Sequence, residues 1–486
     1  MSDAFRNRLI VLLFVIGITL WFWGVNYAHV GIYNANNNYL SLAAKNYLRF
    51  GFGTLKFVPT YFAGEILPSP APYYLHHPIL IFPLSTIPFM MFGFHNWVVH
   101  VTNFLFLVGV IFLLYEIGAL VWNKKVGLWA AGLAMVFPMT SFFWKYIFFE
   151  QGSLFFNLLV FYFFIRYIQV QKTIFLAYIF LFTFLSGLID WGVLYLFLPF
   201  LVFFFSKYRK HVLLVILVYL AAAIISLSFF VGGVYFLRHG FADIVHAVQI
   251  RAVADELFSL SVWPVRLFVI SVIRVGLYFT PFAVVAAWFA YKNIKLTLLF
   301  FLIFGLLNVF VLPTATWGHS YFLFYLIPFF AFSGALWIVG HEKKHGLILG
   351  WIVIIILSSI VVNYYKIQQV QKQLWQYDAA LKINEHLVPY ERIGVINFSG
   401  DMFENYFLHP TQSMRISDIG AWQLGGVYPE IAKIVVSFDP RGSSASLITR
   451  DSQVVVPNIS PRTNSKANIL LEFYRAVRDI LNVGQI

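Results

Sequence analysis

Long apolar stretches, broken by short polar turns, fill the first three quarters of the chain. The first runs from Leu9 to Val25, and ten more follow at residues 97–121, 126–143, 151–168, 173–188, 191–206, 212–236, 266–290, 296–313, 321–339 and 347–364. Each approaches the roughly 20 residues with which a helix crosses about 30 Å of hydrocarbon. The pattern predicts an all-α polytopic membrane bundle of about 11–13 spanning helices.

Residues 77–93 are apolar but short, and Pro78, Pro83 and Pro88 interrupt them. If these residues crossed the membrane, every later turn would lie on the opposite side. We therefore expect an interfacial or re-entrant helix, which is permitted when its free backbone groups find partners within the protein. The first stretch is followed by bulky residues from Asn26 onward and not by a small-residue cleavage site. We therefore expect it to be the first span and to act as its own targeting signal.

Lys and Arg residues gather in the short turns between these stretches. They are Arg6 and Arg8, Lys124 and Lys125, Arg166 and Lys172, Lys207, Arg209 and Lys210, Lys292 and Lys295, and Lys343 and Lys344. With eleven spans they all fall on one side, which the positive-inside rule makes cytoplasmic. We expect a multi-pass protein of the plasma (inner) membrane, with a cytoplasmic N-terminus and with residues 26–96, 238–266 and the C-terminal part outside.

Composition agrees with this interpretation. Of the residues 60% are hydrophobic and only 11% are charged, against about a quarter charged in soluble domains. The formal charge of +13 would suggest nucleic acid in a soluble protein, but here topology and anionic lipid explain the basic turns. The chain has no cysteine, which excludes disulfides, thiolate catalysis and cysteine metal sites.

The pattern changes after about residue 365. Short apolar strands such as Ile393–Phe398 and Lys433–Phe438 alternate with polar, helix-like stretches such as Met402–Leu408. This alternation predicts a small extracytoplasmic α/β domain. The expected division is a membrane domain at 1–365, with its first outer loop at 26–96, and a second domain at 366–486 that leans on the first.

The first outer loop carries the most distinctive motifs. They are Asn34-Ala-Asn-Asn-Asn-Tyr39, then Ala44-Lys-Asn-Tyr-Leu-Arg-Phe-Gly51, then Tyr73-Tyr-Leu-His-His-Pro78, and finally Phe92-Gly93. Asparagines and prolines of this kind also form ordinary surface turns. However, Tyr39, Leu42, Asn46 and Tyr47 have helical spacing, so we expect part of the loop to be a helix lying on the membrane.

This set of motifs resembles the first periplasmic loop of the bacterial C-superfold (GT-C) glycosyltransferases, which include protein O-mannosyltransferases and aminoarabinose transferases. The likeness covers roughly the first two hundred residues at the level of motifs, and the general architecture beyond them. It implies a hexosyl- or pentosyltransferase without a cofactor. Such an enzyme moves a sugar from a polyprenyl-phosphate donor to a lipid, glycan or protein acceptor on the outer side of the membrane.

The chain departs from the family at one position that matters. The family's first loop supplies an aspartate as general base, whereas this loop offers asparagines, and an amide cannot take that proton. Either the base comes from elsewhere, or the protein is a catalytically degenerate member. A transporter or flippase of lipid-linked sugars is a further alternative, although we find neither paired interrupted helices nor ionisable residues near the midplane.

Two acids on the outer side could replace the missing base. Glu150 lies where a span re-enters the membrane, and Asp190 lies between two spans. Either could instead be a helix-end carboxylate or a cap. A carboxylate pair over an apolar floor suits acid–base work, because burial raises the carboxyl pKa.

The remaining candidates would bind the substrate. The Asn36, Asn37 and Asn38 side chains would orient the sugar. Lys145, Arg238 and Arg251 would neutralise the donor phosphate, with His76, His77 and His319 as hydrogen-bond donors, although single cations at helix ends are often interface anchors. Trp191, like Tyr73 and Trp317, could stack on a sugar ring. No metal is expected, because adjacent histidines point apart and no third ligand stands at a suitable spacing.

Overall fold

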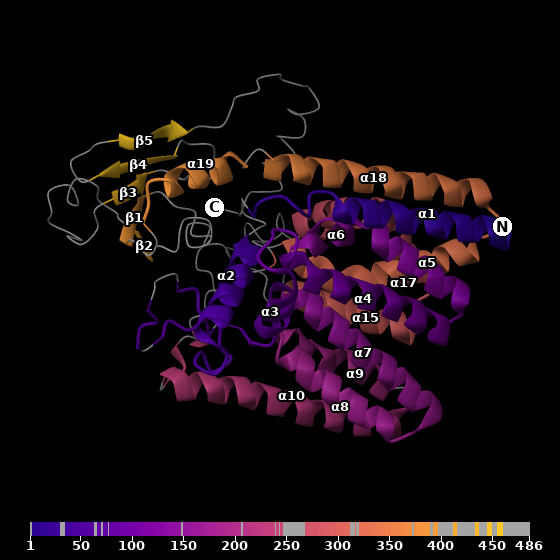
Figure 1. The fold of residues 1–486 in the computed structure, drawn as a ribbon. Coiled ribbons are helices and arrows are strands. Elements are labelled where there is room, and N and C mark those ends of the chain that lie inside the picture. The colour runs from indigo at the N-terminus through magenta and orange to yellow at the C-terminus, as the bar shows by residue number, and fades with distance from the viewer. Residues whose placement is uncertain are drawn as a thin grey trace.

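The computed structural model describes most of the helical region and the strands of the C-terminal region. The described residues are 2–29, 35–62, 66–69, 71–75, 77–146, 149–205, 208–238, 240–242, 244–245, 268–311, 316, 320–371, 374–388, 392–396, 412–415, 433–436, 445–449 and 454–459. The chain forms a bundle of apolar helices with a small sheet at one end, and the N-terminus lies at the opposite end (Figure 1).

The elements follow one another along the chain in this order. The helices of the first half are α1 (Asp3–Phe22), α2 (Ala35–Phe50), α3 (Ile81–Phe92), α4 (Val99–Val121), α5 (Lys124–Val136), α6 (Pro138–Ser141), η2 (Phe143–Lys145), α7 (Phe149–Val170), α8 (Ile174–Gly187), η3 (Trp191–Leu196), α9 (Phe197–Phe204) and α10 (Arg209–Arg238). Those of the second half are η5 (Val269–Arg274), α13 (Val275–Tyr278), α14 (Phe282–Lys292), α15 (Leu296–Phe310), η6 (Ser320–Leu326), α17 (Ile327–Gly340), α18 (His345–Gln371) and α19 (Trp375–Asn384).

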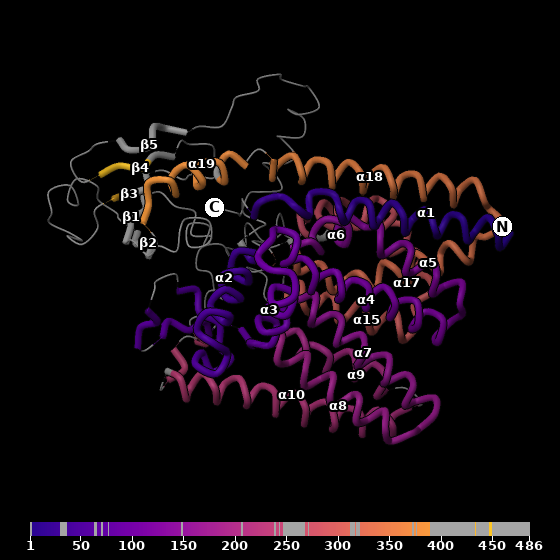
Figure 2. Tube along the Cα trace, in the orientation of Figure 1, coloured from indigo at the N-terminus to yellow at the C-terminus, as the bar shows by residue number. Residues whose placement is uncertain are grey.

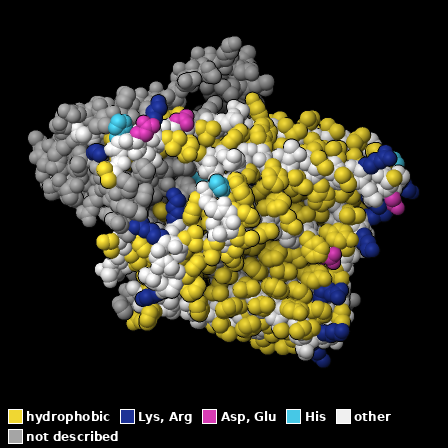
Figure 3. All heavy atoms as spheres, viewed as in Figure 1, with side chains coloured by type: hydrophobic (Ala, Val, Ile, Leu, Met, Phe, Trp, Pro, Cys, Tyr) yellow, Lys and Arg dark blue, Asp and Glu magenta, His cyan; other side chains and the backbone are white. Residues whose placement is uncertain are grey.

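The bundle is that of a multi-pass membrane protein. Within the described residues, six helical stretches are long and apolar enough to cross a membrane: α1, α4, α7, α10, η6 with α17, and α18. Two further units are bent, α5 with α6 and η2 by 57°, and residues 272–278 with α14 by 108°. The shorter apolar helices are α3, α8, η3 with α9, and α15. Apolar side chains cover the visible face of the bundle, while Lys and Arg gather toward its two ends (Figure 3).

The proline-rich stretch forms the short helix α3. It has 12 residues with Pro88 inside it, so it is about 18 Å long and cannot cross the hydrocarbon core upright. It ends at Gly93, whose φ of 73° is a left-handed conformation that favours glycine. The expectation of a helix that does not span therefore agrees with its length.

Small residues let α4 and α5 approach closely, and α5 also packs on α17 and α1. A Cβ added at Gly118 of α4 would lie 2.6 Å from the Cα of Gly127 of α5, and one at Gly127 would overlap the carbonyl oxygen of Tyr115. Helices in membranes associate largely through this kind of close packing, because lipid tails are as apolar as leucine.

The C-terminal region contains a five-stranded sheet in the order β2-β1-β3-β4-β5. The strands are β1 (Arg392–Ile396), β2 (Gln412–Arg415), β3 (Lys433–Val436), β4 (Ala445–Thr449) and β5 (Val454–Ile459). β1 pairs parallel with β2 and β3, whereas β3, β4 and β5 pair antiparallel. α19 contacts β4 and β5, which makes this a small α/β unit.

Two of the expected strands correspond to β1 and β3, while the expected helix at residues 402–408 lies outside the described residues. α18 continues past residue 365 to Gln371, so the helix crosses the expected boundary between the two parts. Along the axis of the bundle, the sheet and α2 lie toward the same end (Figure 2).

Gly127→Ala will destabilise the protein, because the added methyl group must push α4 and α5 apart. Overpacking of a tight contact costs on the order of 1–3 kcal/mol, so we expect thermal unfolding in detergent at a clearly lower temperature. Gly350→Ala in α18 is the matched control, because a Cβ there meets nothing within 4 Å. Equal melting temperatures for the two variants would contradict the packing described here.

Candidate active site

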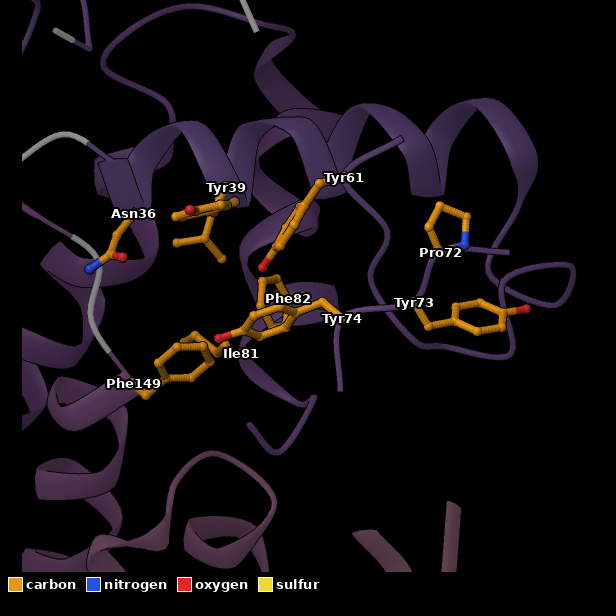
Figure 4. Close-up of a pocket in the computed structure, with 10 residues that line it drawn as sticks. Asn36, Tyr39, Tyr61, Pro72, Tyr73, Tyr74, Ile81, Phe82 and Phe149 are labelled. Atoms are coloured by element: carbon orange, nitrogen blue, oxygen red, sulfur yellow. The ribbon is translucent and has the colours of Figure 1, made fainter. Parts of the chain in front are cut away.

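A cavity of about 390 Å³ lies between the first loop and the start of α7. Four segments line it: α2, the loop at residues 61–74, α3 and the first residue of α7. The lining residues are Asn36, Tyr39, Leu40, Tyr61, Pro72, Tyr73, Tyr74, Ile81, Phe82 and Phe149. Tyr39, Tyr61 and Tyr74 gather on one side, whereas the ring of Tyr73 points away from them (Figure 4). None of these lining side chains carries a formal charge, so we name this space the tyrosine cavity.

Hydrogen bonds from α2 hold the loop that closes the tyrosine cavity. The buried Asn46 amide donates from Nδ2 to the carbonyl oxygens of Thr60, at 2.7 Å, and Phe62, at 2.9 Å. The Thr60 hydroxyl donates to the carbonyl oxygen of Pro72 at 3.0 Å, which ties the two arms of the loop together. The sequence placed Asn46 only within a helical pattern. The structure shows that its amide donates two hydrogen bonds to the loop.

The tyrosines of the cavity contact one another. The ring centroid of Tyr61 lies 4.8 Å from that of Tyr39 and 5.1 Å from that of Tyr74. Burial, with the neighbouring tyrosines Tyr74 and Tyr39, raises the pKa of Tyr61 well above its usual value. Its hydroxyl therefore stays neutral and can both donate and accept a hydrogen bond.

A histidine and an aspartate meet directly beside this cavity. His77 stacks on Phe149, with ring centroids 4.2 Å apart and planes 10° apart, and it also stacks on Tyr74 at 6.2 Å. Its Nδ1 faces Asp190 Oδ1 at 3.7 Å. Both residues are buried. Phe149 and Tyr74 line the tyrosine cavity, so the His77 ring packs against two residues of its wall without lining the cavity itself.

Asp190 has a second neighbour from a distant part of the chain. The Tyr325 hydroxyl donates to Asp190 Oδ2 at 3.1 Å. Although Asp190 stands at the N-cap position of η3, its side chain accepts no capping hydrogen bond from that helix. The alternative that this carboxylate is a helix cap therefore finds no support, because its two oxygens face Tyr325 and His77.

Small and polar residues continue the site between the spans. In α7, Asn157 Nδ2 donates to Ser153 Oγ at 3.2 Å, and Ser186 of α8 donates to Asn157 Oδ1 at 2.9 Å. Gly192 is needed at this point, because a Cβ there would lie 2.6 Å from the Tyr325 hydroxyl and 2.8 Å from Ser153 Oγ.

Glu150, in the first turn of α7, belongs to the same region. It is buried, and it interacts electrostatically with the Tyr325 hydroxyl, as Asp190 does. The structure thus brings both carboxylates near one tyrosine that sequence inspection had not singled out.

Of the three loop asparagines, only Asn36 lines the tyrosine cavity. Asn37 and Asn38 are buried, and Asn38 donates from Nδ2 to the carbonyl oxygen of His29 at 3.0 Å. Asn38 therefore helps to fold the loop.

Lys145 belongs to a separate buried cluster that ties the loop to the bundle. Its Nζ donates to the carbonyl oxygen of Trp23 at 2.7 Å, and its own carbonyl oxygen faces Nδ1 of His100. His29 lies against His100, with ring centroids 5.7 Å apart, and its Nε2 is 2.9 Å from the carbonyl oxygen of Asn96. Lys145 lines a small cavity in this cluster and does not line the tyrosine cavity.

Trp191 directly follows Asp190 in the chain. It packs edge-on against Phe230 of α10, at 5.2 Å, and lines a small apolar cavity together with Pro78 and Asp190. His76, Arg251, Trp317 and His319 lie outside the described residues, as does the side chain of Arg238. Across the described part of the chain, no three His, Asp or Glu side chains form a group that could hold a metal ion.

Solved structures of similar fold complete this picture. The chain resembles ArnT from Cupriavidus metallidurans in the apo state, with a TM-score of 0.61 and 12% identity over 96% of this chain and 100% of that one. ArnT bound to undecaprenyl phosphate gives a TM-score of 0.60 and 13% identity over 94% and 99% of the two chains.

The archaeal oligosaccharyltransferase AglB from Archaeoglobus fulgidus, in complex with an inhibitory peptide and a dolichol-phosphate, gives a TM-score of 0.54 and 14% identity over 89% and 69%. The protein has the GT-C fold. No family model matches the sequence, and no curated protein gives a significant match. The resemblance seen in the first-loop motifs is confirmed at the level of fold.

No local sequence pattern marks the site residues that the sequence did not predict. Tyr325 and Ser153 lie in apolar stretches, and Tyr61 lies in an irregular loop. The usable signals were weak: a glycine directly after Asp190-Trp191, and the recurrence of tyrosine near prolines in the first loop.

Acid will weaken the His29 cluster. Burial lowers the pKa of His29 to about 4, although its hydrogen bond to Asn96 acts in the opposite direction. The unfolded chain binds this proton near pH 6.5, so stability falls as the pH drops from about 6.5 toward 4, by roughly 3 kcal/mol in all. We expect His29→Gln to flatten the fall of the melting temperature between pH 7 and 4.5, relative to wild type. Parallel pH curves would show that His29 is not buried as a neutral group.

Proposed function

We propose that this protein is a membrane glycosyltransferase that takes a sugar from a polyprenyl-phosphate donor and transfers it to a hydroxyl of a lipid, glycan or protein acceptor. The observation that carries this proposal is the tyrosine cavity, uncharged along its described lining and directly beside the buried His77–Asp190 pair. A cavity of a few hundred Å³ with a few convergent polar groups is the usual form of a small-ligand site.

The chemistry needs three things from the site. The acceptor oxygen attacks the anomeric carbon as the bond from that carbon to the phosphate oxygen breaks. The polyprenyl phosphate leaves with the electron pair, and a base takes the acceptor proton. The anomeric configuration inverts. The protein supplies positioning and a base, with Asp190 and Glu150 as the carboxylates of the site and the Asn36 amide as a hydrogen-bond partner of the sugar.

The lipid part of the donor fits the setting. The visible face of the bundle is apolar (Figure 3), and solved structures of the same fold bind undecaprenyl phosphate and dolichol-phosphate. We propose that an isoprenoid tail lies against this face while the phosphate and sugar reach the tyrosine cavity. In this proposal His76, Arg238 and His319 remain candidates for binding the phosphate.

The proposed orientation places the tyrosine cavity outside. The basic residues predicted to be cytoplasmic include Arg6 and Arg8 of α1, at the end of the bundle where the N-terminus lies (Figure 1). The sheet lies toward the opposite end. We propose a cytoplasmic N-terminus and an extracytoplasmic sheet domain that begins after α18, which ends at Gln371, and that approaches the acceptor.

Asp190→Asn and Glu150→Gln will test the assignment. Purified protein in lipid receives labelled polyprenyl-phosphate sugars, with a membrane extract as acceptor. General acid–base groups contribute about 10²–10⁴-fold, so we expect wild type to transfer label and one of the two variants to lose transfer by that factor. Glu342→Gln is the control, because this carboxylate pairs with Lys125 at 2.9 Å, in turns predicted to be cytoplasmic. Donor binding without turnover in wild type would indicate a carrier or a degenerate transferase.

Tyr61→Leu will weaken donor binding, because it removes a ring and a hydroxyl from the wall of the tyrosine cavity. We expect KM for the donor to rise about tenfold, equivalent to about 1.4 kcal/mol, with a smaller change in kcat. Tyr291→Leu is a matched control on an exposed side chain of α14. An unchanged donor KM in Tyr61→Leu would show that the donor's sugar does not bind in this cavity.

A further inference from the structure

The later end of α10 extends beyond the helices that pack against its first part. α10 has 30 residues and is about 45 Å long, whereas α8, which packs against it, has 14 residues. Figure 1 shows α10 continuing past α8 and α9 toward α2. A bilayer measures about 40–45 Å with its headgroup regions. Because Arg209 and Lys210 begin the helix among the headgroups of one leaflet, its later end reaches the headgroup region of the other.

Two neighbouring residues of the first loop are exposed at this end of α10. Val58 of the loop is buried in a hydrophobic cluster with Phe230 and Val234 of α10. Lys56 and Phe57 come directly before it, and both are exposed, Phe57 by 55%. The buried valine thus fixes the loop to α10, while the cation and the aromatic ring before it face the surroundings of the protein.

The backbone at these two residues is unfavourable. Lys56 and Phe57 have φ angles of 53° and 60°, in the left-handed region that residues with bulky side chains rarely adopt. The Phe57 N–H donates to the carbonyl oxygen of Phe52 at 2.9 Å, and the Tyr47 hydroxyl donates to the carbonyl oxygen of Phe57 at 2.8 Å. These bonds hold the conformation. Backbone of this kind is concentrated at ligand-binding sites, and here it accompanies two exposed side chains.

Further aromatic side chains gather at the end of α10. Phe236 is 70% exposed, and Tyr235 and Phe241 are exposed as well. The Lys56 Nζ lies 5.5 Å from the ring centroid of Phe236, within the range of a cation–π contact. The ring centroids of Tyr235 and Phe241 lie 5.2 Å apart. We name Lys56, Phe57, Tyr235, Phe236 and Phe241 the aromatic anchor.

We propose that the aromatic anchor binds an anionic phospholipid of the bilayer, with the lipid phosphate at the Lys56 ammonium and the acyl chains against the exposed rings. Exposed apolar rings are more stable against acyl chains than against water, and basic side chains near a membrane surface attract anionic headgroups. The inference goes beyond the proposed function and does not depend on sugar transfer.

The surface below the anchor continues in the direction that the acyl chains would take. Ile225, Phe229 and Phe236 are all exposed, and their spacing of four and seven residues places them on one face of α10. The ammonium of Lys56 stands over the last of these rings. In the described part of the chain no carboxylate forms an ion pair with Lys56, so its charge is available to a lipid phosphate.

A single introduced thiol can report on the anchor, because the chain has no cysteine. Thr54→Cys places a thiol on an exposed residue beside the anchor, and a bimane fluorophore is attached to it. The full-length protein is reconstituted in vesicles of equal parts phosphatidylglycerol and phosphatidylcholine. The acyl chains of one lipid or the other carry bromine, which quenches bimane at close range. The ratio of the two quenching efficiencies gives the relative affinity of the anchor for the anionic lipid.

We expect brominated phosphatidylglycerol to quench more strongly, with a relative affinity of about fivefold, which is what the attraction of one Lys to anionic headgroups supplies. In the same Thr54→Cys background, Lys56→Gln will make the two lipids quench equally. Lys172→Gln is the control and will leave the ratio unchanged, because it removes an exposed lysine from the turn between α7 and α8.

Phe57→Gly is a second variant that keeps the turn, because glycine adopts a φ of 60° without strain. It removes the ring that faces the acyl chains, so we expect both brominated lipids to quench less than in the parent protein.

Three results would overturn the inference. Absence of quenching by both lipids would place the turn in water. Equal quenching by both lipids in the parent protein would leave a general membrane contact without an anionic site. An unchanged ratio in Lys56→Gln would show that this ammonium does not bind the phosphate. None of these measurements involves sugar transfer, so the proposed function is tested separately.

Discussion

The structure depends on burying a carboxylate where apolar helices meet. Asp190 is 6% exposed at the junction between α8 and η3, and an isolated charge in such a place is strongly unfavourable. It is tolerated because Tyr325 donates to one oxygen and His77 faces the other. These partners come from η6 and from the first loop, so satisfying one carboxylate requires three distant parts of the chain to converge.

That convergence builds the site. Once His77 is placed, its stacking on Phe149 and Tyr74 brings the loop against the start of α7, and Asn46 holds the other arm of the loop to α2. The space left between these elements is the tyrosine cavity. Its described wall is aromatic and uncharged, and the ionisable pair stands at its edge, where low polarity strengthens every electrostatic interaction.

The sequence pattern predicted the architecture of the bundle better than it predicted the site. Apolar stretches predicted the bundle, the prolines of 78–88 predicted a helix too short to span, and alternating strands predicted β1 and β3. These features follow from local periodicity. The pairing of Asp190 with Tyr325 joins residues 135 positions apart, and the serines near it lie within apolar helices, so no local pattern could reveal them. Lys145 shows the opposite limit: as a cation on the predicted outer side it was a reasonable phosphate ligand, yet its Nζ donates to the Trp23 carbonyl oxygen inside the bundle.

The central claim is that the donor's sugar occupies the tyrosine cavity with its anomeric carbon toward His77 and Asp190. An experimental structure of the protein in lipid, with a non-hydrolysable polyprenyl-phosphonate sugar bound, tests it most directly. The account predicts a sugar ring in the tyrosine cavity against Tyr39, Tyr61 and Tyr74, with its anomeric carbon on the side of the cavity where His77 and Asp190 lie. A sugar bound instead in the small cavity beside Lys145, or in the one beside Trp191, would contradict it.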